Sequence, residues 1–85
     1  MYRVIWESSA EKGLARIDKT TASRIKNKVE TYLVQDPINL GEPLLYDWKG
    51  HYRYRCFDDY RVIYKVKEQE LIILVVKVGH RKEVY

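Results

Sequence analysis

The sequence predicts an α+β fold in which two antiparallel N-terminal helices pack on a mainly antiparallel sheet of about four strands. Apolar residues recur at helical spacing through residues 10–33, and apolar and polar residues alternate at strand spacing in the second half of the chain. The order strand, helix, helix and then consecutive strands is typical of α+β domains. Because 85 residues close only one hydrophobic core, residues 1–85 are expected to form a single domain.

The first half of the chain is expected to form one strand and two helices. Residues 2–6 are aromatic and β-branched, as in a strand buried in a sheet. Ser8 and Glu11 have the spacing of a capping box, which predicts that a helix starts there. Residues 18–21 then indicate a break and a fresh helix cap. A second amphipathic helix is predicted over residues 21–35, and it ends just ahead of a proline, which disfavours helical backbone in the preceding residue.

The second half is expected to be sheet. Residues 44–48 fit a short strand, and residues 51–57 fit a strand in which tyrosine and arginine alternate. A turn at residues 58–59 leads into a strand over residues 60–66. Residues 71–78 are so uniformly apolar that a central strand covered on both faces is expected. The last seven residues are expected to leave this sheet as a polar tail.

Composition narrows the class of protein. A formal net charge of +4 and a pI near 9.2 favour anionic partners. The single cysteine, Cys56, excludes an internal disulfide and is expected in the core, which fits a reducing cytoplasm. The longest apolar run is of strand length, so neither a signal peptide nor a membrane span is expected. We therefore expect a cytoplasmic protein with no membrane partner.

Basic residues gather in one predicted hairpin. They are Lys49, Arg53, Arg55, Arg61, Lys65 and Lys67. Strand alternation puts Arg53 and Arg55 on one face, and the turn brings Arg61 near the end of their strand. Because a guanidinium group binds two phosphate oxygens at once, this strip predicts a phosphodiester site. The alternative is a solvated sheet face whose charge is balanced by flanking acids.

Tyrosines lie between these basic residues. Aromatic rings stack on the bases of single-stranded RNA, which makes Tyr52, Tyr54 and Tyr60 candidates for such contacts. Strand alternation nevertheless favours the core for Tyr54 and Tyr64. The expected RNA contacts are Tyr52, Lys49, Lys65 and Lys82.

Three segments of the second half carry a resemblance. They are Tyr52-Arg53-Tyr54-Arg55, then Asp59-Tyr60-Arg61-Val62-Ile63-Tyr64, and then the run from Leu71 through Gly79-His80-Arg81 to Glu83-Val84-Tyr85. In this order they resemble the signature of the RelE branch of the RelE/ParE toxin superfamily. The preceding strand and two helices are similar to that family's order of elements, so the resemblance spans the chain. It implies a RelE-like fold of the microbial-RNase type and a toxin of a type II toxin-antitoxin system.

The resemblance also implies an activity. Such a toxin is an mRNA interferase, a ribosome-dependent endoribonuclease that cleaves the A-site codon by attack of the substrate's own 2′-OH on the adjacent phosphate and so inhibits translation. This chemistry needs a base, positive charge and an acid, and no metal or cofactor is expected. The implied partners are a cognate RelB-like antitoxin, which can form a heterotetramer with the toxin, and the A site of the 70S ribosome with mRNA and 16S rRNA.

Two other functions compete with this one. A ParE-like toxin would use the same scaffold to poison DNA gyrase without catalysis, and an RNA-binding module would need only the basic strip. Arg81 and Tyr85 are expected to discriminate the nuclease from the gyrase poison. The outer face of the second helix carries Arg24, Lys26 and Lys28, which either contact ribosomal RNA or are solvated surface.

The family's site residues can be carried over where the local motif matches. The resemblance assigns catalytic positions to Arg53, Arg55, Arg61, Arg81 and Tyr85. Some relatives have lysines in place of the first two. Since an arginine stays protonated, these two are expected to act only as electrostatic clamps, and the proton acceptor must lie elsewhere.

Two residues are candidates for that proton transfer. His80 is the first, because histidine is the side chain best suited to proton transfer near neutral pH, and the alternative is a polar tail residue with no role in proton transfer. Glu42, in a Glu-Pro-Leu segment that resembles a loop of other superfamily members, is the second, and the alternative is an exposed loop acid. The ring of Tyr85 is expected to stack on a base, unless the terminus simply frays.

Overall fold

The computed structural model describes residues 1–84. It contains longer helices and strands, as predicted from the sequence, and several additional short elements. In chain order the elements are β1 (Arg3–Trp6), α1 (Ser8–Ala15), α2 (Lys19–Thr31), the 3₁₀ helix η1 (Leu33–Gln35), α3 (Pro37–Leu40), β2 (Glu42–Pro43), the 3₁₀ helix η2 (Tyr46–Trp48), β3 (Tyr52–Cys56), β4 (Tyr60–Lys67) and β5 (Ile72–His80). The predicted α+β class is confirmed.

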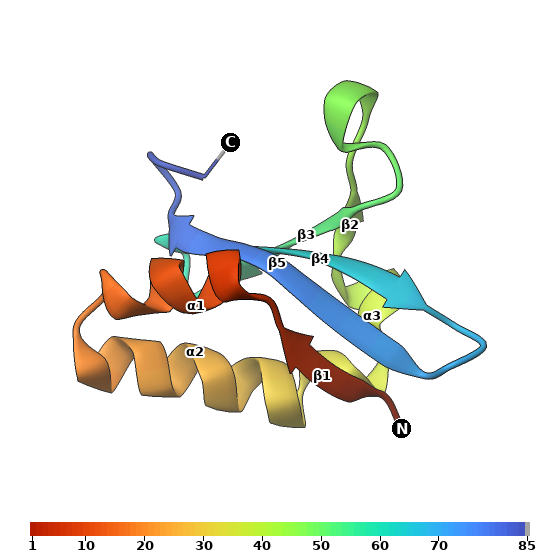
Figure 1. The fold of residues 1–85 in the computed structure, drawn as a ribbon, viewed down its shortest axis with the longest axis horizontal. Coiled ribbons are helices and arrows are strands. Elements are labelled where there is room, and N and C mark those ends of the chain that lie inside the picture. The colour runs from red at the N-terminus through yellow and green to blue at the C-terminus, as the bar shows by residue number, and fades with distance from the viewer. Residues whose placement is uncertain (85) are drawn as a thin grey trace.

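One sheet contains all five strands, in the order β1-β5-β4-β3-β2 (Figure 1). The strands from β2 to β5 pair antiparallel with their neighbours, whereas β1 runs parallel to β5 with Arg3 opposite Ile72. The sheet is mainly antiparallel, as predicted, but it has one strand more than expected. The prediction of a strand over residues 44–48 is wrong, because the chain pairs with β3 earlier, through Glu42 and Pro43, and then turns into η2.

Two helices cover one face of the sheet, and their starts differ in how they are capped. α1 begins at Ser8, but the residue in the cap position is Glu7 and no side chain caps the helix. The predicted capping box is therefore wrong, because Ser8 already lies inside the first turn. The second cap is as predicted, since the Asp18 carboxylate accepts a hydrogen bond from the backbone N–H of Thr21 at 3.0 Å.

The main core lies between the helices and the sheet. It contains Ala10, Leu14, Ile25, Val29, Leu33, Val34, Tyr54, Cys56, Val62, Tyr64, Ile73, Val75 and Val78. Tyr54, Cys56 and Tyr64 are buried, as the sequence predicts. The Tyr64 hydroxyl donates a hydrogen bond to the carbonyl oxygen of Pro37 at 2.7 Å, which satisfies the one polar group of this side chain.

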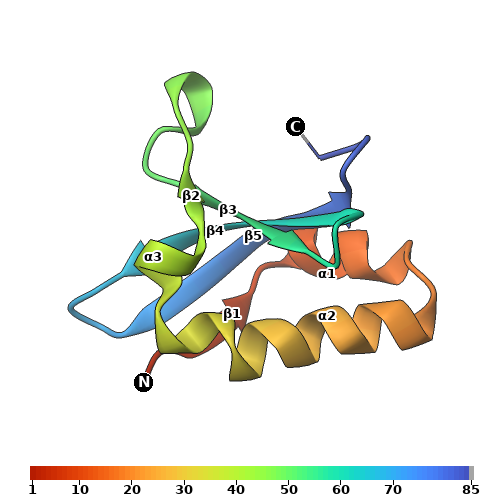
Figure 2. The ribbon, with the colours of Figure 1, turned by 180° about the vertical axis from the view of Figure 1, so that it is seen from behind.

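A smaller apolar cluster lies on the opposite face of the sheet, the side on which η2 and the turn after β5 are found (Figure 2). Leu44, Ile63 and Val84 are buried there. The prediction that the last seven residues leave the sheet is wrong, because β5 continues to His80 and the following turn returns Val84 to the sheet. A methyl group on Gly79 would meet Val84 Cγ2 at 2.5 Å, so a larger residue there would force the Val84 side chain to shift. In residues 1–84, no helix is both long enough and apolar enough to span a bilayer.

Candidate active site

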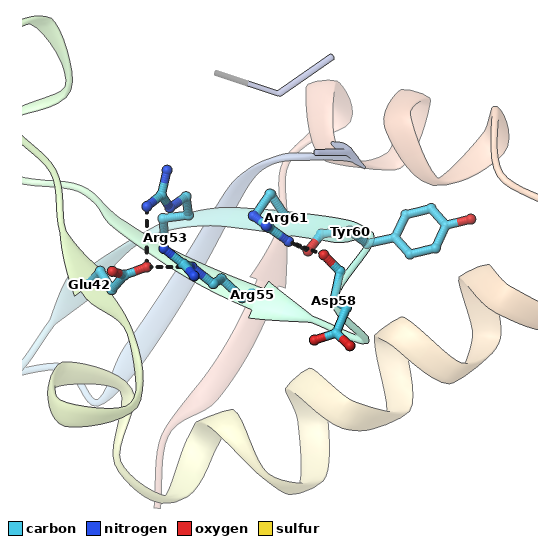
Figure 3. Close-up of polar contacts among 6 residues, drawn as sticks. All are labelled: Glu42, Arg53, Arg55, Asp58, Tyr60 and Arg61. Carbon is cyan, nitrogen blue, oxygen red and sulfur yellow. Dashed lines mark hydrogen bonds and ion pairs between the residues drawn. The ribbon is translucent and has the colours of Figure 1, made fainter. Parts of the chain in front are cut away.

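Three arginines share the face of the sheet that lies away from the helices. On β3, the tyrosines and the cysteine point into the helix-side core, so Arg53 and Arg55 point to the other side. In the β3–β4 hairpin, Arg55 pairs directly with Arg61, and paired residues project to the same face. Figure 3 shows these three side chains above adjacent strands. The predicted juxtaposition of Arg53, Arg55 and Arg61 is thus present in the structure.

The β3–β4 turn fixes the position of Arg61. Arg61 Nη1 donates hydrogen bonds to the carbonyl oxygens of Asp58 at 2.6 Å and Tyr60 at 2.9 Å (Figure 3). Phe57 and Asp58 have φ values of 50° and 58°, a left-handed conformation that turns the Asp58 carbonyl toward the guanidinium group. A guanidinium group held at one end by backbone carbonyls needs little reorganisation when an anion binds its other donors.

Arg81 joins this group from the turn that follows β5. Its backbone N–H donates to the carbonyl oxygen of Asp59 at 2.8 Å, and its Nε lies 3.8 Å from Asp59 Oδ1. Partial burial lowers the pKa of Arg61, and the positive charges of Arg55, Arg53 and Arg81 lower it further. Because Arg53, Arg55 and Arg61 share one face of the sheet and Arg81 is held beside the β3–β4 turn by Asp59, we call these four residues the arginine cluster.

Glu42 lies at the edge of the arginine cluster. It pairs with Arg53 across the β2–β3 register, and its Oε1 accepts hydrogen bonds from Arg53 Nη2 at 3.2 Å and Arg55 Nε at 3.1 Å. The hydrogen bond from Arg53 and the charge of Arg55 lower the pKa of this carboxyl group against the opposing effect of desolvation. The structure therefore brings Glu42 to the predicted site, as a half-exposed strand residue in two ion pairs.

Two residues predicted for the site lie on the other face. His80 pairs with Tyr60 across β4 and β5, and its ring packs edge to face on the Tyr60 ring at 5.7 Å. Because Tyr60 and Arg61 are consecutive strand residues, this register turns His80 away from Arg61. The Tyr52 ring stacks on Tyr64 at 5.7 Å and packs against the helix-side core. The structure therefore does not bring His80 or Tyr52 to the arginine cluster.

The remaining predicted positions are peripheral. Lys49, Lys65 and Lys82 are exposed, and Lys65 follows Arg61 along β4 at strand spacing. The backbone N–H of Lys82 lies 3.2 Å from His80 Nδ1, so its described contact is with the histidine. Tyr85 lies outside the described residues. Within residues 1–84, no three residues among His, Cys, Asp and Glu are grouped in a way that could hold a metal ion.

Sequence reasoning missed the part played by the turn between β3 and β4. Asp58 was predicted only as a turn residue, yet its backbone carbonyl holds Arg61. Its neighbour Phe57 was predicted as the last residue of a strand, whereas it lies in the turn with positive φ. The sequence signal for this turn was the pair Asp58-Asp59, because Asp adopts the left-handed conformation more readily than most residues.

Comparison with known proteins supports the resemblance. Residues 4–85 match the family described as the ParE toxin of the type II toxin-antitoxin system parDE. Toxin RelG of Mycobacterium tuberculosis is 21% identical over 84 residues, which cover 99% of this chain and 95% of that protein.

Solved structures share the fold. The toxin-antitoxin complex RelBE2 from Mycobacterium tuberculosis contains a chain that superposes with a TM-score of 0.87 at 21% identity, covering 94% of this chain and 98% of that one. A chain of the intact E. coli RelBE toxin-antitoxin complex gives a TM-score of 0.72 at 21% identity, covering 93% of this chain and 95% of that one. Because the family match extends over nearly the whole sequence, this chain belongs to the RelE/ParE superfamily and is a toxin of a type II toxin-antitoxin system.

Proposed function

We propose that this toxin is a ribosome-dependent mRNA endoribonuclease that cleaves the A-site codon by attack of the substrate's 2′-OH on the adjacent phosphate. The observation that carries the proposal is the arginine cluster, in which β3, β4 and the turn after β5 bring four guanidinium groups together. Like charges held together in this way favour binding of an anion, and guanidinium groups match phosphate oxygens in geometry.

Each arginine has a distinct part in this mechanism. Attack by the 2′-OH forms a 2′,3′-cyclic phosphate and breaks the bond between phosphorus and the 5′ oxygen, which takes a proton from water. During this step additional negative charge develops on the phosphate oxygens. Arg61, already oriented by the Asp58 carbonyl, stabilises that charge together with Arg81. Arg53 and Arg55 bind the phosphate and hold it in line for attack. Because all four stay protonated, they contribute charge and position only.

Glu42 is the proposed proton acceptor for the 2′-OH. In the free protein its hydrogen bonds to Arg53 and Arg55 lower its pKa and make it a weak base. A bound phosphate competes for the same donors, and loss of these bonds returns the pKa of Glu42 toward its ordinary value. The carboxylate thus gains basicity when substrate is present. Tyr85, outside the described residues, is proposed to stack on a base beside the scissile phosphate.

The proposed partners follow from the same relatives. Two of the solved structures are toxin-antitoxin complexes named RelBE, and we propose that this chain likewise binds a cognate RelB-like antitoxin. The proposed target is the A site of the 70S ribosome, with mRNA and 16S rRNA, which places the toxin in the cytoplasm.

A gyrase poison is the second candidate, because the matching family carries the description of a ParE toxin. Binding to gyrase does not require a cluster of four arginines, so the arginine cluster favours the nuclease.

Primer extension on mRNA from translating ribosomes tests the nuclease. Wild-type toxin is expected to produce cuts at A-site codons, and Arg81→Ala is expected to lose most of them. Equal cut patterns from the two proteins would remove Arg81 from the mechanism. If wild-type toxin made no cuts and instead inhibited DNA supercoiling by gyrase, the nuclease proposal would be rejected in favour of the gyrase poison.

A further inference from the structure

The helical side of the molecule carries a second group of basic and aromatic residues, which is distinct from the arginine cluster on the other face of the sheet. Arg24, Lys28 and Tyr32 follow one another at intervals of four residues along α2 and its C-terminal cap, so they share one helical face. The guanidinium of Arg24 lies 4.7 Å from the centre of the Phe57 ring, and the ammonium of Lys28 lies 4.5 Å from the centre of the Tyr32 ring. We call these four residues the α2 stripe.

The two cations of the α2 stripe are not neutralised by the protein. Within residues 1–84, neither Arg24 nor Lys28 forms an ion pair, although like charges four residues apart on a helix repel each other. Lys26, which lies between them in sequence, instead pairs with Glu11 at 3.7 Å. The α2 stripe is therefore a concentrated positive surface that favours an anionic ligand.

Phe57 is held at the surface in an unusual backbone conformation. Its φ of 50° is left-handed, a conformation that Gly, Asn and Asp adopt readily and that a bulky residue adopts rarely. Its side chain is nevertheless 39% exposed, as is that of Tyr32. The turn between β3 and β4 would form more easily with asparagine at this position, so the aromatic ring has a use other than forming the turn.

A groove lies beside the Phe57 ring. It has a volume of about 460 Å³ and is lined by Phe57, Arg24, Lys28, Ser23 and Asn27. Ser23 and Asn27 add hydrogen-bonding groups beside the two cations. The groove thus combines a planar aromatic ring, a planar guanidinium group, positive charge and polar side chains.

We propose that the α2 stripe is a binding site for single-stranded RNA. Bases stack on Phe57, on the Arg24 guanidinium and on Tyr32, while Arg24 and Lys28 neutralise phosphates, in the manner of sequence-tolerant single-strand binders. Double-stranded RNA would use the charges but not the rings, and an acidic protein would not require a strained aromatic residue. The inference deepens the proposed function, since it gives a ribosome-directed toxin a second RNA contact on its helical side.

Fluorescence anisotropy with a labelled 2′-O-methyl oligouridine tests the site. This probe has no free 2′-OH, so it binds without being cleaved, and the measurement needs no ribosome. The measurement therefore tests RNA binding by the α2 stripe independently of the nuclease proposal. Each variant is measured in the wild-type background and in the Arg61→Ala background, which removes part of the second anion site.

The variants separate stacking from charge. Phe57→Asn, which suits the left-handed turn, is expected to weaken binding about tenfold, whereas Phe57→Tyr keeps the ring and the affinity. Arg24→Gln and Lys28→Gln are each expected to lower the slope of log affinity against log salt by about one. Lys26→Gln, the matched control on the same helix, is expected to change the affinity less than about twofold because its charge is already paired.

Three results would overturn the proposal. Unchanged binding by Phe57→Asn would remove the stacking role. Equal losses for Lys26→Gln and Lys28→Gln would reduce the α2 stripe to unspecific positive charge. Loss of affinity for a purified antitoxin, with RNA affinity unchanged across all variants, would assign this surface to a protein partner.

Discussion

Glu42 lies directly across from Arg53 in the β2–β3 pair, and one of its carboxylate oxygens bridges Arg53 and Arg55. The two arginines proposed to bind substrate phosphate are thus already engaged by an internal anion. This arrangement relieves part of the repulsion within the arginine cluster, and it makes the substrate a competitor of Glu42.

Glu42→Gln is expected to lower stability at neutral pH and to have no effect in acid. Because Arg53 and Arg55 lower the pKa of the Glu42 carboxyl group, the ion pairs stabilise the fold fully above the ordinary value of 4.5, and that stabilisation is lost as pH falls through the lower pKa of the folded state. The Glu42 side chain is 50% exposed, so the difference at pH 7 is less than about 1 kcal/mol. Thermal unfolding at pH 7 and at pH 2 measures it. A difference of equal size at both pH values would contradict the ion-pair explanation.

Arg61→Ala is expected to slow cleavage by about 10²–10³-fold, equivalent to roughly 2.7–4 kcal/mol of transition-state stabilisation, and Arg81→Ala by a similar factor. Arg61→Lys keeps the charge but loses the guanidinium geometry that reaches the Asp58 carbonyl, so it is expected to recover only part of the rate. Initial rates by primer extension, with circular dichroism to verify folding, give the comparison. A folded Arg61→Ala protein with the wild-type rate would exclude Arg61 from charge stabilisation.

Tyr64→Phe is expected to destabilise the fold by about 1–3 kcal/mol, because it leaves the buried carbonyl oxygen of Pro37 without its hydrogen bond. For a domain of this size each kcal/mol lowers the midpoint of thermal unfolding by about 4–8 °C. Tyr46→Phe is the matched control, since that side chain is 90% exposed. Equal melting temperatures for the two variants would show that the Tyr64 hydrogen bond adds no net stability.

Gly13→Ala is expected to destabilise the fold by about 1–3 kcal/mol, although alanine favours a helix more than glycine does. A methyl group at Gly13 would lie 2.0 Å from the carbonyl oxygen of Val78, so α1 would have to move away from β5. Lys12→Ala, at an exposed position of the same helix, is the control. Chemical denaturation measures both, and a more stable Gly13→Ala protein would mean that α1 has room to shift.

The sequence was sufficient to predict the arginine face. Period-two alternation along β3 and closure of a short hairpin determine that Arg53, Arg55 and Arg61 lie together, and both follow from local patterns. The superfamily and the α+β class were equally accessible, because they rest on the order of the elements.

The sequence was not sufficient where the outcome depends on register or on pairing across the fold. β5 continues two residues beyond its apolar run, and successive residues of a strand point to opposite faces of the sheet. His80 therefore lies on the same face as Tyr60, its partner in β4, and not on the face of Arg61. Glu42 reaches the arginine cluster because a Glu-Pro dipeptide pairs with β3, and neither its composition nor its spacing indicates a strand. In each case tertiary pairing, rather than local preference, decides the position.

The parallel pairing of β1 with β5 has a consequence for the timing of biosynthesis. Residue 3 finds its partner only in residue 72, so a nascent chain carries β1 without a neighbour until most of the sequence has emerged. Contacts between such distant segments form late and slowly. Because β4 and β5 supply much of the main core, the fold and the arginine cluster are complete only after the fifth strand has been synthesised.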